Sequence, residues 1–181
     1  MNSPSLTFRN GHRVTFVEEG ADERGRYLRL EHVLPEAGRQ AGPHWHPVLA
    51  ERWTVRRGRL RFRIDGTEVA AEQGDSAEAA AGVVHEFWSE EPGTIIDHEI
   101  RPPLRHWEMF RLWQALDAAG KTTKGGVPRD PLALALLWDY QDGYLGGIPA
   151  GLQRAVFGSL ARLARRLGYE RRWLPPVHSR M

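Results

Sequence analysis

The sequence predicts an antiparallel β-sandwich or barrel followed by a helical segment, and three observations support this prediction. Residues 59–64 alternate charged and apolar side chains, which is the pattern of a strand with one buried face. Asp65-Gly66 follows at once and is typical of a tight hairpin turn with positive φ. After Pro102-Pro103 the spacing of the apolar residues becomes helical. Short strands separated by turns are typical of an all-β domain, here with a helical extension.

Further strands are expected along the first hundred residues, because β-branched and apolar residues cluster there between turn signals. Within residues 59–64 the inward side chains would be Leu60, Phe62 and Ile64. A turn at residues 90–93 separates the last two expected strands. The remaining expected strands are residues 7–9, 13–17, 27–34, 51–55, 83–89 and 94–100.

Helices are expected over residues 105–118, 132–140 and 152–167. Asp130-Pro131 is a suitable cap and first-turn proline for the second, and Gly168 a suitable C-cap for the third. An apolar stripe follows one side of the third helix. We expect the barrel of the same chain to cover this stripe, in preference to a partner subunit and then to a lipid surface. The stripe consists of Leu152, Val156, Leu160, Leu163 and Leu167.

We place the domain boundary after residue 104, where the pattern and the charge both change. Residues 1–100 carry 12 basic and 17 acidic side chains, whereas residues 101–181 carry 13 basic and 6 acidic ones. The expected organisation is a β-barrel domain over residues 1–104 and a helical extension over residues 105–181. The arginines of the extension occur without a recognised nucleic-acid motif, so no nucleic-acid partner is expected. A membrane surface is also a disfavoured partner, since such helices usually pack on their own protein.

The composition excludes several classes of protein. The chain has no cysteine, which excludes disulfides and thiolate metal ligands. The first residues lack a basic region followed by an apolar core, so no signal peptide is expected. No apolar run approaches the roughly 20 residues that a membrane span needs. We therefore expect a cytoplasmic protein.

Histidines and one glutamate form the candidate functional site. Residues two apart on a strand point to the same face, so His44 and His46 are expected to share a face. Glu51 can return to that face after the chain bends at Pro47. Two imidazoles and a carboxylate that converge inside a β-structure form a candidate metal site, and His85 can supply a third imidazole.

Two motifs around these residues resemble the signature motifs of the cupin superfamily. The second motif departs from the family pattern at Ala80 and Ser89, where proline and asparagine are usual. Those two positions shape a turn and a strand end and do not ligate metal. In the first motif the matching residues are Gly38, His44, His46, Glu51 and Gly58, and in the second they are Gly74, Gly82 and His85.

The resemblance implies a cupin-type antiparallel jelly-roll β-barrel in a small bacterial monocupin with a C-terminal helical extension. It also implies one divalent transition metal per chain, and Fe, Mn, Ni, Cu and Zn all suit three imidazoles and a carboxylate. Cupin barrels commonly pair through their sheets, so a homodimer is expected. The implied metal ligands are His44, His46, Glu51 and His85.

Strand alternation indicates which other side chains face the barrel interior. Trp53, Phe62 and Phe87 are expected to line a pocket for a small-molecule substrate or ligand. His32 and His98 are further pocket candidates, each on a face that is otherwise apolar. A histidine in such surroundings is more often a core residue that is hydrogen-bonded to a neighbour. The alternative, that His32 or His98 orients a metal ligand, stays open.

Three functions remain open. We favour a metal-dependent dioxygenase, an oxidoreductase acting on a small aromatic or enol-type molecule, because four protein ligands leave two positions of an octahedral ion free. A metal-dependent isomerase, cyclase or lyase would use the same ion as a Lewis acid. A non-catalytic module would bind a small molecule without turnover. The sequence assigns no catalytic residue beyond the metal ligands.

Overall fold

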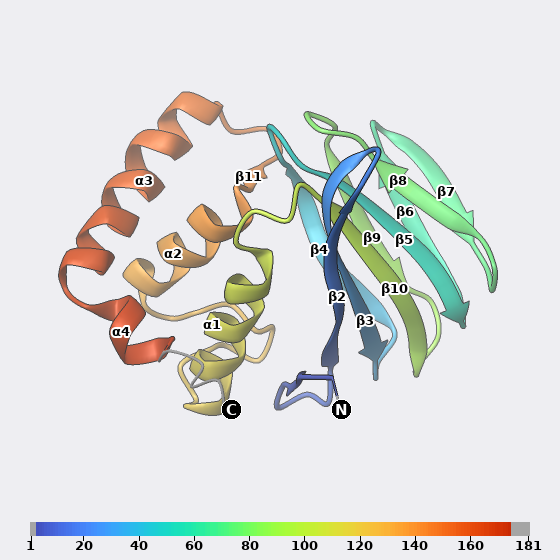
Figure 1. The fold of residues 1–181 in the computed structure, drawn as a ribbon, viewed down its shortest axis with the longest axis horizontal. Coiled ribbons are helices and arrows are strands. Elements are labelled where there is room, and N and C mark those ends of the chain that lie inside the picture. Colours follow the sequence, from blue (N-terminus) through green and yellow to red (C-terminus); the bar gives the residue numbers. More distant parts are fainter. Residues whose placement is uncertain (1–2, 175–181) are drawn as a thin grey trace.

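The computed structural model describes residues 3–174 and contains two antiparallel β-sheets with a layer of helices beside them (Figure 1). The strands are β1 (Ser5–Thr7), β2 (Arg13–Asp22), β3 (Gly25–Leu34), β4 (Gly38–Trp45), β5 (Ala50–Arg57), β6 (Leu60–Ile64), β7 (Thr67–Ala71), β8 (Ser76–Ala79), β9 (His85–Ser89), β10 (Thr94–Arg101) and β11 (Tyr144–Leu145). One sheet has the order β1-β2-β3-β10-β5-β8, and the other has the order β11-β4-β9-β6-β7. This is the antiparallel jelly roll that the sequence predicts.

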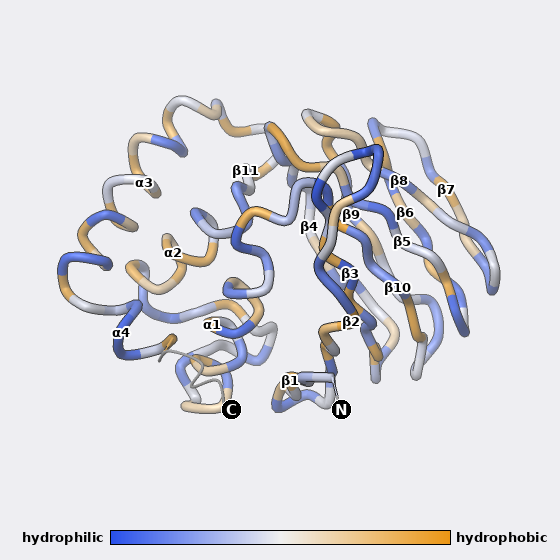
Figure 2. Tube along the Cα trace, viewed as in Figure 1, coloured by the Kyte–Doolittle hydropathy of each residue, from blue (hydrophilic) through white to orange (hydrophobic). Residues whose placement is uncertain are grey.

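The helical layer follows the last long strand of the barrel. Its helices are α1 (His106–Ala118), α2 (Pro131–Gln141), α3 (Ala150–Arg166) and α4 (Tyr169–Trp173). As predicted, Asp130 caps α2, because its side chain accepts a hydrogen bond from the Leu132 amide at 2.8 Å. The apolar α2 lies between α1 and α3 and is hydrophobic along most of its length (Figures 1 and 2). The short β11 leaves this layer to pair with β4, so the extension also adds a strand to the barrel.

Two apolar cores meet inside the molecule. The first lies between the two sheets and includes Trp53 and Phe62. The second lies between the helices and the inner face of β2, β3 and β10, where Leu30 packs with Phe110 and other residues of α1. Each core alone is small, and burial of apolar area in both stabilises the fold. The inner face of the six-stranded sheet therefore belongs partly to the barrel and partly to the helical extension.

The alternation read from the sequence gives the correct inward faces. Leu60 and Phe62 are buried, and Trp53 and Val55 share the buried face of β5 with Glu51. The turn at residues 65 and 66 has φ values of 49° and 77°, as the hairpin prediction requires. The elements β7, β8, β11 and α4 have no counterpart among the predicted elements, and β4 was expected only through the strand alternation of His44 and His46.

The expectation that the barrel covers the apolar stripe of α3 is wrong. Four of its five members are largely exposed, and Leu160 alone is partly buried. The helix packs on α2, and its buried Ala161 and Ala164 are small enough to permit a close approach of two helices. Among the described residues no helix is long and apolar enough to cross a membrane. The exposed members are Leu152 (59%), Val156 (47%), Leu163 (44%) and Leu167 (61%).

We predict that Gly58→Ala destabilises the fold far more than Gly66→Ala. Both glycines have positive φ, which costs an alanine roughly 1–2 kcal/mol. Only at Gly58 would the added Cβ also collide, at 2.5 Å from Oγ1 of Thr94. Overpacking adds about 1–3 kcal/mol there, while nothing lies within 4 Å at Gly66. Urea unfolding of the two variants measures the difference, and equal stabilities would contradict the prediction.

Candidate metal centre

Four side chains predicted as ligands converge between the two sheets. His44 on β4 lies directly opposite His85 on β9. Glu51 comes from β5 of the facing sheet, and His46 lies in the loop after β4. One potential ligand atom from each residue lies within 4.8 Å of all the others. Two bonds of about 2.1 Å span roughly 4.2 Å across an ion, so this spacing suits a single metal.

Backbone carbonyls hold the three imidazoles in one tautomer. A carbonyl can only accept a hydrogen bond, so each Nδ1 in contact with one must carry the proton. In the neutral ring, Nε2 then carries a free lone pair, and in His46 and His85 this atom faces Glu51. This is the usual arrangement around metal-ligating histidines. The donors and acceptors are His44 Nδ1 with Gly42 O (2.8 Å), His46 Nδ1 with Gln141 O (2.9 Å) and His85 Nδ1 with Val83 O (3.0 Å).

The inner atoms of the cluster require a cation. His85 Nε2 and His46 Nε2 lie 2.9 Å and 3.1 Å from the same carboxylate oxygen, Oε2 of Glu51. His46 Nε2 is buried and has no hydrogen-bond partner within the described part of the chain. Three lone pairs that face one another repel unless a proton or a metal ion lies between them. A nitrogen-rich donor set with one carboxylate is suited to a divalent transition metal.

The charges of the cluster show how it behaves without an ion. Burial acts to raise the pKa of the Glu51 carboxyl, but contacts with His46, His85 and His98 outweigh burial and hold it well below its usual value. Burial lowers the pKa of His44 to about 4, so this imidazole is neutral at physiological pH. Burial also acts to lower the pKa of His46, yet the nearby Glu51 and two backbone carbonyls raise it overall. In the ion-free centre a proton on His46 therefore takes the place that a metal would occupy.

The four candidate ligands differ in exposure. His46, Glu51 and His85 are buried, whereas His44 is only half-buried. The chain segments beside it carry the exposed Val84 and Pro43. The Gly146 backbone packs against both, since a Cβ there would lie 3.2 Å from Val84 and 3.3 Å from Pro43. The residues next to His44 and His85 in the chain are therefore largely apolar.

The helical extension positions two of the candidate ligands. The sequence did not indicate this contribution of the extension. The carbonyls of Gln141 and Asp142, the last residue and the C-cap of α2, accept from His46 Nδ1 at 2.9 Å and 3.3 Å. Leu145 of β11 pairs with His44. Buried Gln153 of α3 clamps that strand, because it accepts from the Leu145 amide at 2.8 Å and donates to the Leu145 carbonyl at 3.0 Å.

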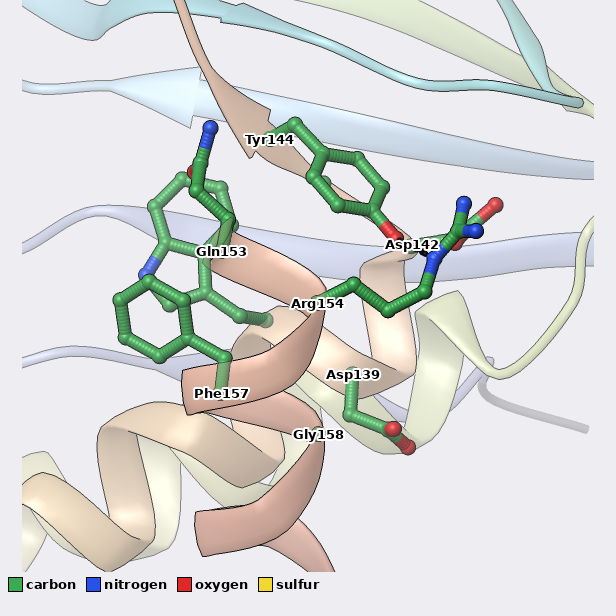
Figure 3. Close-up of a pocket in the computed structure, with 9 residues that line it drawn as sticks. Asp139, Asp142, Tyr144, Gln153, Arg154, Phe157 and Gly158 are labelled. Atoms are coloured by element: carbon green, nitrogen blue, oxygen red, sulfur yellow. Dashed lines mark hydrogen bonds between the residues drawn. The ribbon is translucent and has the colours of Figure 1, made fainter. Parts of the chain in front are cut away.

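A small cavity of about 80 Å³ lies between α2, β11 and α3, on the same segment (Figure 3). The side chains of Tyr144 and Arg154 approach one another at its rim, and Arg154 Nε donates to the Tyr144 hydroxyl at 3.2 Å. Asp139 and Asp142 also line it. None of the four candidate ligands lines this cavity, so we regard it as part of the support for the β11 segment.

The candidate pocket residues lie inside the barrel. Trp53 packs against His85 and His98, with ring centroids 5.5 Å and 5.4 Å away. Phe62 is fully buried behind Trp53, and Phe87 is partly buried beside both. Their role as substrate walls stays a prediction, because in this structure Trp53 and Phe62 are packed core residues.

The other two pocket candidates, His32 and His98, are buried and hydrogen-bonded. His98 Nε2 donates to Oε1 of Glu51 at 3.0 Å, and His32 bonds to His98 at 3.3 Å. Two further histidines join this group: His12, bonded to His32, and His106, whose ring lies 6.1 Å from His46. The sequence offers only a general indication of a role for His12 and His106, namely eight histidines among 181 residues in a chain without cysteine.

Comparison with known proteins agrees with this fold. Residues 31–98, which include all four candidate ligands, match the family described as the cupin domain. No curated protein matches the chain. The family match shows that residues 31–98 are similar to a cupin domain, and the antiparallel jelly-roll topology of this part of the chain agrees with it.

Several solved structures are similar to about half of the chain. KdgF from a Halomonas species is 16% identical, with 55% of this chain and 86% of that chain covered and a TM-score of 0.48. An RmlC-like cupin from Shewanella frigidimarina is 15% identical, with 54% and 83% covered and a TM-score of 0.45. A sugar phosphate isomerase of the cupin superfamily from Silicibacter pomeroyi is 17% identical, with 56% and 73% covered and a TM-score of 0.43. These identities are too low to transfer an activity.

We predict that His46 and His44 titrate at opposite ends of the histidine range in the ion-free protein. His46 should take up a proton above pH 6.5, because its protonated form is stabilised by Glu51, whereas His44 should stay neutral down to about pH 4. Glu51→Gln removes the stabilising charge, so the pKa of His46 should then fall below 6.5 through burial. Imidazole ¹⁵N NMR titration measures both groups. An unchanged His46 pKa in the Glu51→Gln variant would contradict this account of the centre.

Proposed function

We propose that His44, His46, Glu51 and His85 hold one divalent transition metal ion and that the protein is a metal-dependent dioxygenase of small organic molecules. The supporting observation is a cluster of one ligand atom from each residue within 4.8 Å, in which all three imidazoles donate from Nδ1 to a carbonyl and two of them, His46 and His85, direct Nε2 at one buried carboxylate oxygen. When bound, an octahedral ion supplies a redox or Lewis-acid centre with two positions left for oxygen-bearing ligands.

The residues around the ligands favour a small, mainly apolar molecule. Pro43 and Val84 directly precede His44 and His85 in the chain, and Trp53 packs against His85 on the interior side. Such walls exclude water and orient a ring or an enol-type skeleton through apolar contact. One carboxylate and three neutral imidazoles leave one positive charge on a divalent ion, so phenolate or enediolate oxygens would be attracted to it.

Self-association is a separate part of the proposal. The exposed stripe of α3 presents four apolar side chains at one side of the molecule. Full burial of one such side chain contributes roughly 1.5–3 kcal/mol, which favours contact with a second apolar surface. A homodimer would provide this surface.

The metal site predicts about one divalent ion per chain and a steep loss in variants. If roughly 10 kcal/mol of binding free energy is shared by four ligands, each lost ligand weakens binding about a hundredfold. His44→Ala should weaken binding to this extent, and the His44→Ala/His46→Ala double variant should hold no ion after dialysis. Gln40 lies on the same strand as His44 but outside the cluster, so Gln40→Ala serves as the control. Elemental analysis and Zn²⁺ competition titrations measure occupancy, and full occupancy of the double variant would refute the assignment.

The dioxygenase proposal predicts that dioxygen consumption accompanies substrate loss. Protein reconstituted with Fe(II) or Mn(II) should consume one O₂ per molecule of a reactive enediol or catechol. An oxygen electrode and product analysis over a panel of such compounds measure this ratio, with the double variant as the blank. Turnover of a panel compound without O₂ would instead indicate an isomerase, cyclase or lyase. Saturable binding without any turnover would indicate a binding module.

A further inference from the structure

We infer that His98, His32 and His12 are positioning residues that hold Glu51 with one oxygen toward the ion and the other away from it. The inference rests on the proposed metal site. His98 touches the candidate ligand Glu51 directly, and the other two histidines act through it. The chain of contacts leads from the buried centre to the turn that precedes β2.

Three consecutive hydrogen bonds connect these residues. His98 Nε2 lies 3.0 Å from Oε1 of Glu51. His98 Nδ1 lies 3.3 Å from His32 Nε2, and His32 Nδ1 lies 3.1 Å from His12 Nε2. His98 and His32 each use both ring nitrogens, so no lone pair or proton of either ring remains available for another partner.

The strand register produces this chain. In the six-stranded sheet Ile100 is paired with Glu51 and Ile96 with His32, so His98 lies diagonally beside both. Val14 of β2 is paired with His32, and His12 lies two residues before it. Diagonal neighbours on one face are within reach of long side chains. The four groups therefore form a line across the adjacent strands β5, β10 and β3 to the residue that precedes β2, and this line follows the border between the two apolar cores.

The carboxylate sets the direction of every bond in the chain. An ionised carboxylate only accepts, so His98 must donate from Nε2, and its neutral ring then accepts at Nδ1. His32 must consequently donate from Nε2 to His98 and accept at Nδ1 from His12. One tautomer, with the proton on Nε2, is imposed on all three rings. It is opposite to the tautomer of His44, His46 and His85, which carry the proton on Nδ1.

Aromatic packing fixes the planes of the rings. Trp53 stacks on His98 with centroids 5.4 Å apart and an interplanar angle of 16°. The edge of Phe110 meets His32 at 5.3 Å. Phe8 stacks on His12 at 5.3 Å and 18°. With the rings held in this way, Oε1 of Glu51 is occupied by His98, and Oε2 alone is left facing His46 and His85.

A series of phenylalanine substitutions tests this role against simple core packing. Phenylalanine keeps the ring and its stacking but removes both hydrogen bonds. We expect the affinity for Zn²⁺ to fall about tenfold or more in His98→Phe, less in His32→Phe and about twofold in His12→Phe, since loss of a group that orients a ligand costs 10–100-fold. His98→Gln retains an N–H donor in the position of Nε2 and should bind within about threefold of wild type.

His106→Phe is the matched control. His106 is buried at the same border, 6.3 Å from the His98 ring, but it makes no hydrogen bond to Glu51. Circular dichroism and thermal unfolding verify that each variant folds. A loss in His98→Phe that is matched by His106→Phe would show general core damage and overturn the inference. Equal affinities of wild type, His98→Phe and His98→Gln would overturn it as well.

Imidazole ¹⁵N NMR provides a readout that packing alone does not change. In the Zn²⁺-loaded protein His98 and His32 should be neutral with the proton on Nε2, and His44, His46 and His85 with the proton on Nδ1. His98 with its proton on Nδ1 would contradict the direction of the chain, even if the metal site stands. If wild type binds Zn²⁺ no better than the His44→Ala/His46→Ala variant, the proposed metal site fails, and the positioning role fails with it.

Discussion

A buried carboxylate at the border of two apolar cores is the constraint on which the rest of this structure depends. Glu51 is 5% exposed, and its pKa is held well below the usual value, so it is charged inside the protein. An isolated charge there would be destabilising by several kcal/mol or more, which makes compensating partners a requirement of folding. Imidazoles surround it on both sides, and apolar residues close the shell behind them. The arrangement of the two sheets can be understood as the scaffold that brings these partners to one carboxylate.

The same constraint explains why the extension is integral to the centre. The barrel provides the four inner side chains, but His46 depends on carbonyls beyond α2 and His44 on an edge strand clamped from α3. His46 and these carbonyls are about a hundred residues apart in the chain but are in direct contact in the fold. The charge change near residue 101 and the proline pair mark a change of pattern. They do not mark a division of the site, because both parts of the chain contribute to it.

Local sequence patterns predicted most of the barrel and the four candidate ligands. Alternation in residues 59–64, the Asp65-Gly66 turn and the spacing of the histidines each depend on neighbours a few positions apart. Gln141 and Asp142 could not be found in this way, since they act through backbone carbonyls that every residue has. The stripe of α3 was misjudged for a related reason, because periodicity identifies an apolar face but not its neighbour.

Contacts between diagonal neighbours on adjacent strands could not be predicted from the pattern of a single strand either. His32 and His98 were each visible as a histidine on an apolar face, but the bond between them depends on the pairing of β3 with β10. His12 lies outside any predicted strand, and only the β2–β3 register brings it to His32. The partners of a buried histidine are thus a property of the sheet and not of its own strand.

The contact between His46 and the end of α2 would also couple binding of the proposed ion to conformational stability. An ion that binds only the folded centre stabilises it by about 2.7 kcal/mol when its free concentration is a hundred times the dissociation constant. Part of this free energy acts on the segment after α2, because its carbonyls fix the imidazole that the ion requires. Metal supply would thereby govern how often the helical layer opens, and hence how susceptible the protein is to proteolysis and turnover in the cell.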